Sequence, residues 1–324
     1  MDNKMLLTEE TARECKELAN AIISEINRVI VGKQDSVRLL VTALIAGGHV
    51  LIEDVPGTGK TTLASALAAV SGLEFKRAQF TPDVTASDIT GFNTYNRHTE
   101  KFEFNQGVVM CNILLADEIN RASPKTQSAL LEAMEEGAVT VDGETYPLPD
   151  PFIVVATQNP TGFVGTYSLP EAQLDRFTLR LTLGYPTRDE EVRMLQDRKN
   201  YDPMDKVSPI TDIEKIKMLK NAANAVLTDD KILKYAVDLV SGTRKCTAFS
   251  IGASPRATLS LVNTAKARAI TEGRCFVIPE DVKAVFIPVT EHRVVMKRDA
   301  KIAGKTPTGE LLDILKATPV PFFR

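Results

Sequence analysis

The stretch 53–62, with the sequence EDVPGTGKTT, contains residues whose types and order suit the binding of phosphate groups. An apolar run precedes it and a run rich in alanine and leucine follows, so the sequence predicts a strand, a glycine-rich loop and a helix. Gly57 and Gly59 lack a Cβ atom, which lets backbone N–H groups turn inward around phosphate oxygens, and the helix adds its own N–H groups. The side chain of Lys60 can reach β- and γ-phosphates, and the hydroxyl of Thr61 can bind Mg²⁺. The expected nucleotide-binding residues are Pro56, Gly57, Thr58, Gly59, Lys60, Thr61 and Thr62.

One position departs from the usual phosphate-loop pattern. The pattern G-x-x-x-x-G-K-[ST] begins with glycine, and this chain has Asp54 there. The simpler alternative is a glycine-rich turn without function. Residues further along the chain argue against that alternative.

Two adjacent acids, Asp117 and Glu118, follow a second apolar run, VVMCNILL at 108–115, which predicts a strand buried on both faces. An acid beside the phosphate loop can hold Mg²⁺ through water, and the next carboxylate can orient and deprotonate an attacking water. We therefore expect Asp117 to bind the metal together with Thr61, and Glu118 to be the general base. Adjacent acids are also common on surfaces, but the apolar run in front of this pair favours the catalytic interpretation.

Three further polar residues are candidates for catalysis beside Glu118. Asn159 follows the next predicted strand, where its amide could position the water or contact the γ-phosphate, although Asn-Pro is also a turn signal. Arg176, in LPEAQLDRF, offers the fixed positive charge that phosphoryl transfer needs, although a lone arginine before a strand is usually a surface residue. Arg256, in GASPRA, lies in the first turn of a predicted helix, where a cation opposes the helix dipole. A nucleotide phosphate would supply the anion that this placement needs.

The pattern of strands and helices changes near residue 185. Before it, strands alternate with helices, which predicts an α/β domain over 1–185 with a mostly parallel sheet and right-handed crossovers. After it, helical patterns dominate, with capping boxes predicted at Thr187 and Thr211, so 186–324 is expected to be a helical domain. Two hairpins are also predicted, one within 81–107, after a loop and a short helix near Ser87, and one at 139–146.

Composition narrows the class of protein. The 324 residues are 44% hydrophobic and 25% charged, which is ordinary for a soluble globular chain. The net charge of −3 argues against a general nucleic-acid coat. The N-terminus is polar, and no apolar run approaches the length of a membrane span, about 18 residues. Four cysteines lie far apart without a CxxC pair, which predicts reduced thiols and a cytoplasmic location.

The order of these motifs resembles the AAA+ ATPases, and within them the MoxR group. The matching stretches are EDVPGTGKTTLA, QFTPDVTASDITGF, LLADEINRASPKTQSALLEAMEEG, ATQNP, LPEAQLDRF and GASPRA. They cover most of the chain from about Val31 to Arg256, with weaker similarity beyond. Members commonly carry aspartate at the position of Asp54, so the missing glycine does not count against the resemblance.

The resemblance implies an α/β AAA+ P-loop core, with Walker A and Walker B motifs, followed by a C-terminal all-α lid. It implies ATP and Mg²⁺ as cofactors, and a homo-oligomeric ring, often a hexamer, in which Arg176 reaches the nucleotide of the neighbouring subunit. Arg256 would be the second sensor, in its own subunit or across the interface, and 92–107 would be an inserted hairpin suited to acting on a substrate. MoxR-type proteins act as chaperone-like machines on client proteins. They often work with a partner that contains a von Willebrand factor A domain, in metal insertion or complex maturation.

Two other functions remain open. One is a nucleotide-gated oligomeric switch that turns over slowly and mainly presents a surface. The other is a DNA-acting motor. The net acidic charge and the lack of an appended DNA-binding domain argue against this function and against a nucleic-acid partner. Arg121 could link Glu118 to a subunit interface or form a surface ion pair. The hairpin aromatics Phe92, Phe102 and Phe104 could pack or could grip a substrate.

Overall fold

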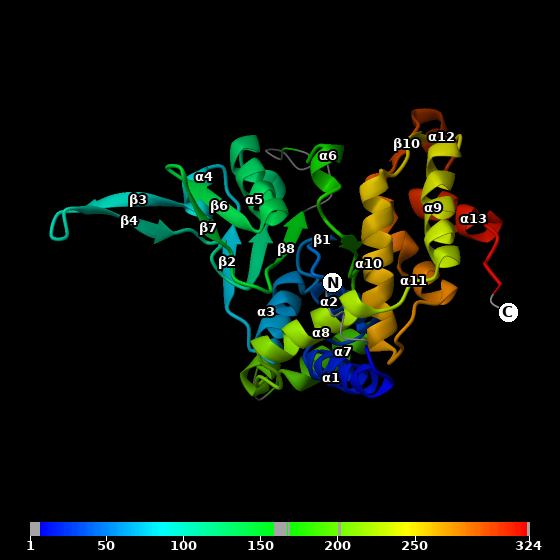
Figure 1. Ribbon diagram of the computed structural model, residues 1–324, viewed down its shortest axis with the longest axis horizontal. Coiled ribbons are helices and arrows are strands. Elements are labelled where there is room, and N and C mark those ends of the chain that lie inside the picture. The colour runs from blue at the N-terminus through cyan, green and yellow to red at the C-terminus, as the bar shows by residue number, and fades with distance from the viewer. Residues whose placement is uncertain (1–6, 159–166, 168, 200–201, 323–324) are drawn as a thin grey trace, which may run out of the picture.

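The structure is a computed structural model that describes residues 7–158, 167, 169–199 and 202–322. An α/β part is followed by a mainly helical part (Figure 1). Within the described ranges, every helix is too short or too polar to cross a lipid bilayer. The elements of the first part are α1 (Glu9–Asn27), α2 (Gln34–Ala46), β1 (Val50–Glu53), α3 (Lys60–Ser71), β2 (Phe75–Gln79), α4 (Ala86–Thr90), β3 (Gly91–Asn96), β4 (Lys101–Gln106), β5 (Ile113–Asp117), η1 (Ile119–Arg121), α5 (Pro124–Glu136), β6 (Ala138–Val141), β7 (Glu144–Pro147), β8 (Ile153–Gln158), α6 (Glu171–Leu174) and β9 (Leu179–Leu181).

The central sheet has five strands in the order β2-β5-β8-β1-β9, and every pairing is parallel. Because parallel strands share their direction, their carboxyl ends meet at one edge. The register aligns Gln79 with Asp117, and it aligns Glu53 with Gln158. The carboxyl ends of β1, β5 and β8 therefore lie at the same edge of the sheet.

Alternate residues of each strand face opposite layers of helices. Ile113 and Leu115 of β5 belong to a core that includes α1, α2 and α3. Leu114 and Ala116 of the same strand belong to a second core that includes α5. A strand buried on both faces must be apolar at every position, which is why its sequence is a continuous apolar run.

Two hairpins lie at the β2 side of the molecule (Figure 1). The hairpin β3–β4 projects away from the body, and β6–β7 lies at its base. The turn of β6–β7 has left-handed backbone at Asp142 (φ 50°) and Gly143 (φ 86°), as an Asp-Gly turn between paired strands requires. The rings of Phe104 and Tyr146 stack at 3.9 Å between centroids and join the two hairpins. Phe104 therefore packs, as the sequence allowed.

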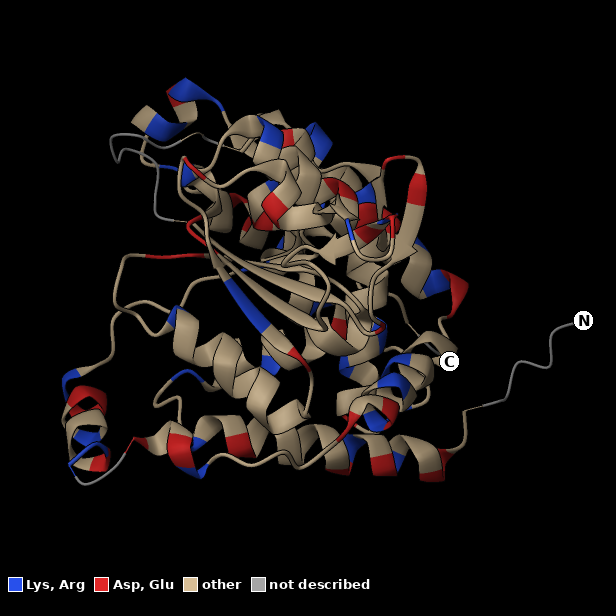
Figure 2. Ribbon diagram, turned by 90° about the vertical axis from the view of Figure 1, so that its left-hand side faces the viewer, with Lys and Arg blue, Asp and Glu red and all other residues tan. Residues whose placement is uncertain are grey.

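The second part carries the remaining helices. Its elements are α7 (Arg188–Asp197), η2 (Pro203–Lys206), α8 (Ile213–Ala225), α9 (Asp230–Lys245), β10 (Phe249–Ile251), α10 (Pro255–Thr271), α11 (Pro279–Thr290), η3 (Glu291–Arg293), β11 (Val295–Met296), α12 (Arg298–Ile302) and α13 (Pro307–Ala317). Helices α8 and α10 pack on α1 and α2, so one hydrophobic core continues from the first part into the second. Basic and acidic residues are interspersed along the outer helices (Figure 2).

The predicted strand 108–115 is wrong at its start, because β5 begins five residues later. Val108 and Val109 donate backbone hydrogen bonds to the carbonyl oxygens of Asp88 (3.0 Å) and Ile89 (3.3 Å). They close the chain after β4 against α4 and contribute to the second core. Apolar character signalled burial correctly here but did not distinguish a strand from a buried turn.

The capping box predicted at Thr187 is confirmed, whereas the one at Thr211 is wrong. Helix α8 is capped by Asp212, whose carboxylate accepts a hydrogen bond from the backbone of Lys215 at 2.9 Å. A carboxylate is at least as good a cap as a threonine hydroxyl, so the neighbouring residue takes the position. The short strands β10 and β11, which form an antiparallel pair in the helical part, were not predicted.

Candidate functional site

The phosphate loop connects β1 to α3 at the carboxyl edge of the sheet, as the sequence predicts. Gly57 (φ 86°) and Gly59 (φ 88°) both have left-handed backbone, which side chains with a Cβ rarely adopt. No atom lies within 4 Å of the place where a Cβ would sit at either glycine, so the backbone there faces open space. The N-cap of α3 is Gly59, and no side chain caps the helix. The loop and this helix end thus offer backbone donors to an anion.

Lys60 begins α3 and is only 8% exposed. Its Nζ donates a hydrogen bond to the backbone carbonyl of Asp54 at 2.7 Å, which folds the side chain back across the loop. Burial lowers the pKa of Lys60, and the negative charges of Asp54, Asp117 and Glu118 oppose that shift. The structure therefore brings the lysine and the acid pair into one electrostatic neighbourhood.

The other residues of the loop lie where the sequence places them. Thr61 and Thr62 are partly buried in the first turn of α3. Pro56 is exposed, and the hydroxyl of Thr58 donates to the carbonyl of Val55 at 3.3 Å. A threonine hydroxyl at the start of this helix is a suitable oxygen ligand for Mg²⁺.

The side chain of Asp54 is buried and links the phosphate loop to the far end of the sheet. One carboxylate oxygen accepts from the backbone of Val55 at 2.8 Å. The other accepts from the backbones of Leu183 at 2.7 Å and Gly184 at 2.6 Å. These two amides lie just after β9, where the chain leaves the sheet. Sequence analysis assigned this residue no role, and only the structure shows its partners.

Glu53 belongs to a second connection in the same direction. Its carboxylate pairs with Arg180 of β9 at 2.6 Å. The same guanidinium pairs with Glu291, which follows α11, at 2.8 Å. Thr308, in α13, donates a hydrogen bond to Glu291. The end of β1 is thus tied through one arginine to the helical part.

The acid pair stands at the end of β5 and depends on β8 beside it. The hydroxyl of Thr157 donates to Asp117 at 2.6 Å and accepts from the backbone N–H of Glu118 at 2.9 Å. Arg77 of β2 pairs with the second oxygen of Asp117 at 2.8 Å. Glu118 has left-handed backbone (φ 54°), an uncommon conformation for a residue with a side chain, which is often found at functional positions.

Two side chains of the described residues contact the carboxylate of Glu118. Arg121 pairs with it at 2.9 Å, and Gln79 of β2 donates to the same oxygen at 3.0 Å. Arg121 therefore contacts Glu118 within the subunit, which is the local ion pair that the sequence left as one of two alternatives. Thr157, Arg77 and Gln79 were missed by sequence analysis, because strand order alone brings them to the acids.

Arg176 and Arg256 come together at Glu135 of α5. Arg176 pairs with one carboxylate oxygen at 2.9 Å, and Arg256 pairs with the other. Asp175 links the segments that carry the two arginines. Its carboxylate accepts a hydrogen bond from Ser254, the residue that caps α10, at 2.7 Å, and another from buried Arg293 at 2.8 Å. Arg176 and Arg256 thus share Glu135 as an ion-pair partner. Asn159 lies outside the described residues.

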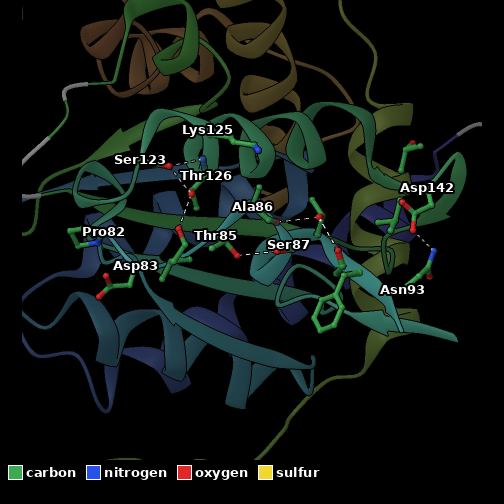
Figure 3. Close-up of a pocket in the computed structure, with 16 residues that line it drawn as sticks. Pro82, Asp83, Thr85, Ala86, Ser87, Asn93, Ser123, Lys125, Thr126 and Asp142 are labelled. Carbon is green, nitrogen blue, oxygen red and sulfur yellow. Dashed lines mark hydrogen bonds between the residues drawn. The ribbon is translucent and has the colours of Figure 1, made fainter. Parts of the chain in front are cut away.

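A separate hollow lies between α4, the start of α5 and the turn of β6–β7 (Figure 3). Thr126 donates to the carbonyl of Val84 at 2.8 Å on one side of it. Asn93 donates to Asp142 at 2.9 Å on the other side and bridges the two hairpins. Polar side chains and backbone line much of this hollow.

Comparison with known proteins places the two parts of the chain in two families of domains. The family model described as "ATPase family associated with various cellular activities (AAA)" matches residues 49–179. The model described as "AAA lid domain" matches residues 241–314. The α/β part with its parallel sheet is thus an AAA core, and the helical part contains its lid.

Relatives align over nearly the whole chain. YeaC of Bacillus subtilis is 47% identical over 95% of this chain and 96% of its own length. Chaperone MoxR1 of Mycobacterium tuberculosis is 39% identical over 97% of this chain and 85% of its own. A crystal structure from Cytophaga hutchinsonii superposes with a TM-score of 0.88 at 36% identity, covering 97% of this chain and 98% of the other. On this extent of similarity, the chain belongs to the MoxR family of AAA+ ATPases.

Proposed function

We propose that this protein hydrolyses ATP in the presence of Mg²⁺. The observation that carries the proposal is the neighbourhood of Lys60, Asp117 and Glu118, a buried lysine and two acids beside an uncapped helix start. Phosphoryl transfer needs positioning and charge stabilisation more than covalent chemistry, and these groups supply both.

The residues divide the work as follows. The backbone of the phosphate loop and Lys60 would bind the phosphates, and Thr61 and Asp117 would hold the metal. Both oxygens of Asp117 already accept one hydrogen bond each, yet a carboxylate has further lone pairs, so a contact through metal-bound water still fits. When bound, Mg²⁺ would neutralise charge on the phosphates. Glu118 would orient the attacking water and take its proton, and Asn159 would contact the γ-phosphate or that water.

The active form in this proposal is a ring, and we take a hexamer as the expected size. Arg176 would contact the nucleotide of the neighbouring subunit, and Arg256 would act at the same place. Their common pairing with Glu135 supports a joint action of the two guanidiniums. A heterologous interface that repeats around a closed ring would bring them to the next phosphate loop.

The biological role that we propose is chaperone-like remodelling of client proteins, in complex maturation or metal insertion and together with a von Willebrand factor A domain protein. A relative called a chaperone supports the class of activity. The hairpin β3–β4 supports a client contact, because Phe92 (47%), Tyr95 (54%) and Phe102 (71%) are exposed on it. Four free cysteines agree with a cytoplasmic location.

A slowly turning nucleotide switch is the second candidate, because Arg121 and Gln79 both hold one oxygen of the Glu118 carboxylate and restrict its movement toward a water. Glu118→Gln separates binding from hydrolysis. We expect this variant to bind ATP like the wild type and to lose hydrolysis. Unchanged turnover would refute the role of Glu118, and turnover that a client or partner accelerates would argue against the switch.

Ring formation is tested by the light-scattering mass of the protein with and without ATP·Mg²⁺.

A further inference from the structure

Glu135 lies between two arginines that come from distant parts of the chain. Each oxygen of its carboxylate receives one guanidinium, from Arg176 and from Arg256. The three side chains remain 33%, 30% and 44% exposed, respectively, so the cluster is open to solvent. Two guanidiniums around one carboxylate carry a net positive charge, and such a pair is a suitable receptor for a phosphate group.

The backbone beside each arginine is fixed independently of Glu135. Asp175 precedes Arg176, and Ser254 lies two residues before Arg256. Their side chains are hydrogen-bonded to each other at 2.7 Å. Arg293, which is 5% exposed, anchors Asp175 from the helical part. The two arginines would therefore stay close to one another if the glutamate were to move away.

The helix dipoles favour this contact, and its exposure makes it replaceable. Glu135 is in the last turn of α5, where a negative charge is unfavourable, and Arg256 is in the first turn of α10, where a positive charge is unfavourable. Each relieves the other only while they are paired. Ion pairs that are this exposed are weak, so a multiply charged anion can compete with the single carboxylate.

We propose that Glu135 is an internal counter-ion that occupies the phosphate-binding position of Arg176 and Arg256 in the isolated subunit and leaves it when nucleotide of a neighbouring subunit arrives. The inference rests on the proposed function in one respect, namely that the two arginines act on that nucleotide. Glu135 would thus restrain the arginines until a ring interface forms.

The direct test uses inorganic triphosphate as the probe and weakens its binding at the protein's own phosphate loop with Lys60→Ala. Binding of triphosphate is measured by calorimetry for this variant alone and combined with Glu135→Gln, and circular dichroism checks folding. The added change is expected to tighten binding roughly threefold to tenfold, since it removes a competing surface ion pair. A further Arg176→Ala change should abolish the gain. Equal or weaker binding with Glu135→Gln would overturn the proposal.

The matched control is Glu136→Gln, the next residue of α5, which is also exposed. It removes the same charge from the same helix end without touching the arginine cluster, so an equal gain in this control would likewise overturn the proposal. A second readout is ATP turnover of the full chain against protein concentration, where Glu135→Gln should reach half-maximal turnover at a lower concentration. If the wild type hydrolyses no ATP, the proposed function fails, and the triphosphate titration still decides the role of Glu135.

Discussion

Replacement of Asp54 by glycine would restore the usual first residue of the phosphate-loop pattern, yet we expect it to destabilise the protein. Asp54 is not among the residues with left-handed backbone, so its position does not require glycine. Its carboxylate accepts three backbone N–H groups, from Val55, Leu183 and Gly184. Glycine would remove all three bonds and the only described tie between the loop and these two amides after β9.

The size of the effect follows from the burial of these groups. Asp54 is 5% exposed, and Leu183 is 6% exposed, so water cannot easily replace the carboxylate there. A hydrogen bond to a charged group contributes about 1.5–3 kcal/mol. Val55 and Gly184 are less buried and can recover most of their loss from water. We therefore expect a loss of about 3–4 kcal/mol for Asp54→Gly, including the added backbone entropy of glycine.

Thermal unfolding followed by circular dichroism measures this loss. A fall of roughly 4–6 °C in the midpoint is expected for a chain of this size. Asp54→Asn keeps one acceptor oxygen, so its unfolding midpoint should lie between those of the wild type and Asp54→Gly. Asp83→Gly is the matched control, because Asp83 is exposed in a loop and the same substitution there should cost little. A midpoint of Asp54→Gly at or above that of the wild type would refute the reasoning.

Three other changes follow from buried polar contacts. Thr157→Val removes the hydroxyl that binds both Asp117 and the backbone N–H of Glu118. It should cost about 1–3 kcal/mol of stability and raise the Mg²⁺ concentration for half-maximal hydrolysis, as a metal titration can check. Arg293→Met leaves Asp175 without its buried partner and should cost about 3–5 kcal/mol in urea unfolding. Burial holds the pKa of His49 at about 4, so the unfolded chain binds more protons between pH 6.5 and 4, and stability falls as the pH is lowered. His49→Gln should reduce the loss between pH 7 and pH 5 by roughly 2 kcal/mol in urea unfolding.

Matched variants separate these effects from general damage. Thr157→Ser keeps the hydroxyl and should retain Mg²⁺ dependence and stability. Arg298→Met removes an exposed arginine and should leave the unfolding midpoint unchanged. For His49, an equal loss of stability in acid for the wild type and the variant would show that this ring does not resist protonation.

Features that depend on neighbouring residues could be predicted from the sequence. The phosphate loop, the capping box at Thr187 and the Asp-Gly turn are decided by residues a few positions apart. The contacts that hold the acid pair could not be predicted in this way. Thr157 and Asp117 are separated by 40 positions, and they meet because β8 lies beside β5 in the sheet.

The role of Asp54 shows a second reason why parts of the site could not be predicted from the sequence. Sequence comparison with a motif treats this residue as a departure from glycine, whereas its function in the fold is to accept amides 129 and 130 positions away. The pairing of Arg176 and Arg256 with Glu135 is equally non-local. The boundary between 1–185 and 186–324 stays a prediction, as does the role of Asn159.

The central claim, ATP hydrolysis at a site shared between subunits, is tested most directly by mixing two inactive variants. Glu118→Gln keeps Arg176 but lacks the base, and Arg176→Ala keeps the base but lacks the arginine. In a mixed ring, an Arg176→Ala site beside a Glu118→Gln neighbour has both groups. We predict that an equal mixture regains about a quarter of wild-type turnover, as random placement around a closed ring requires. A mixture that stays as inactive as its components, or an Arg176→Ala variant that hydrolyses ATP normally alone, would contradict the account.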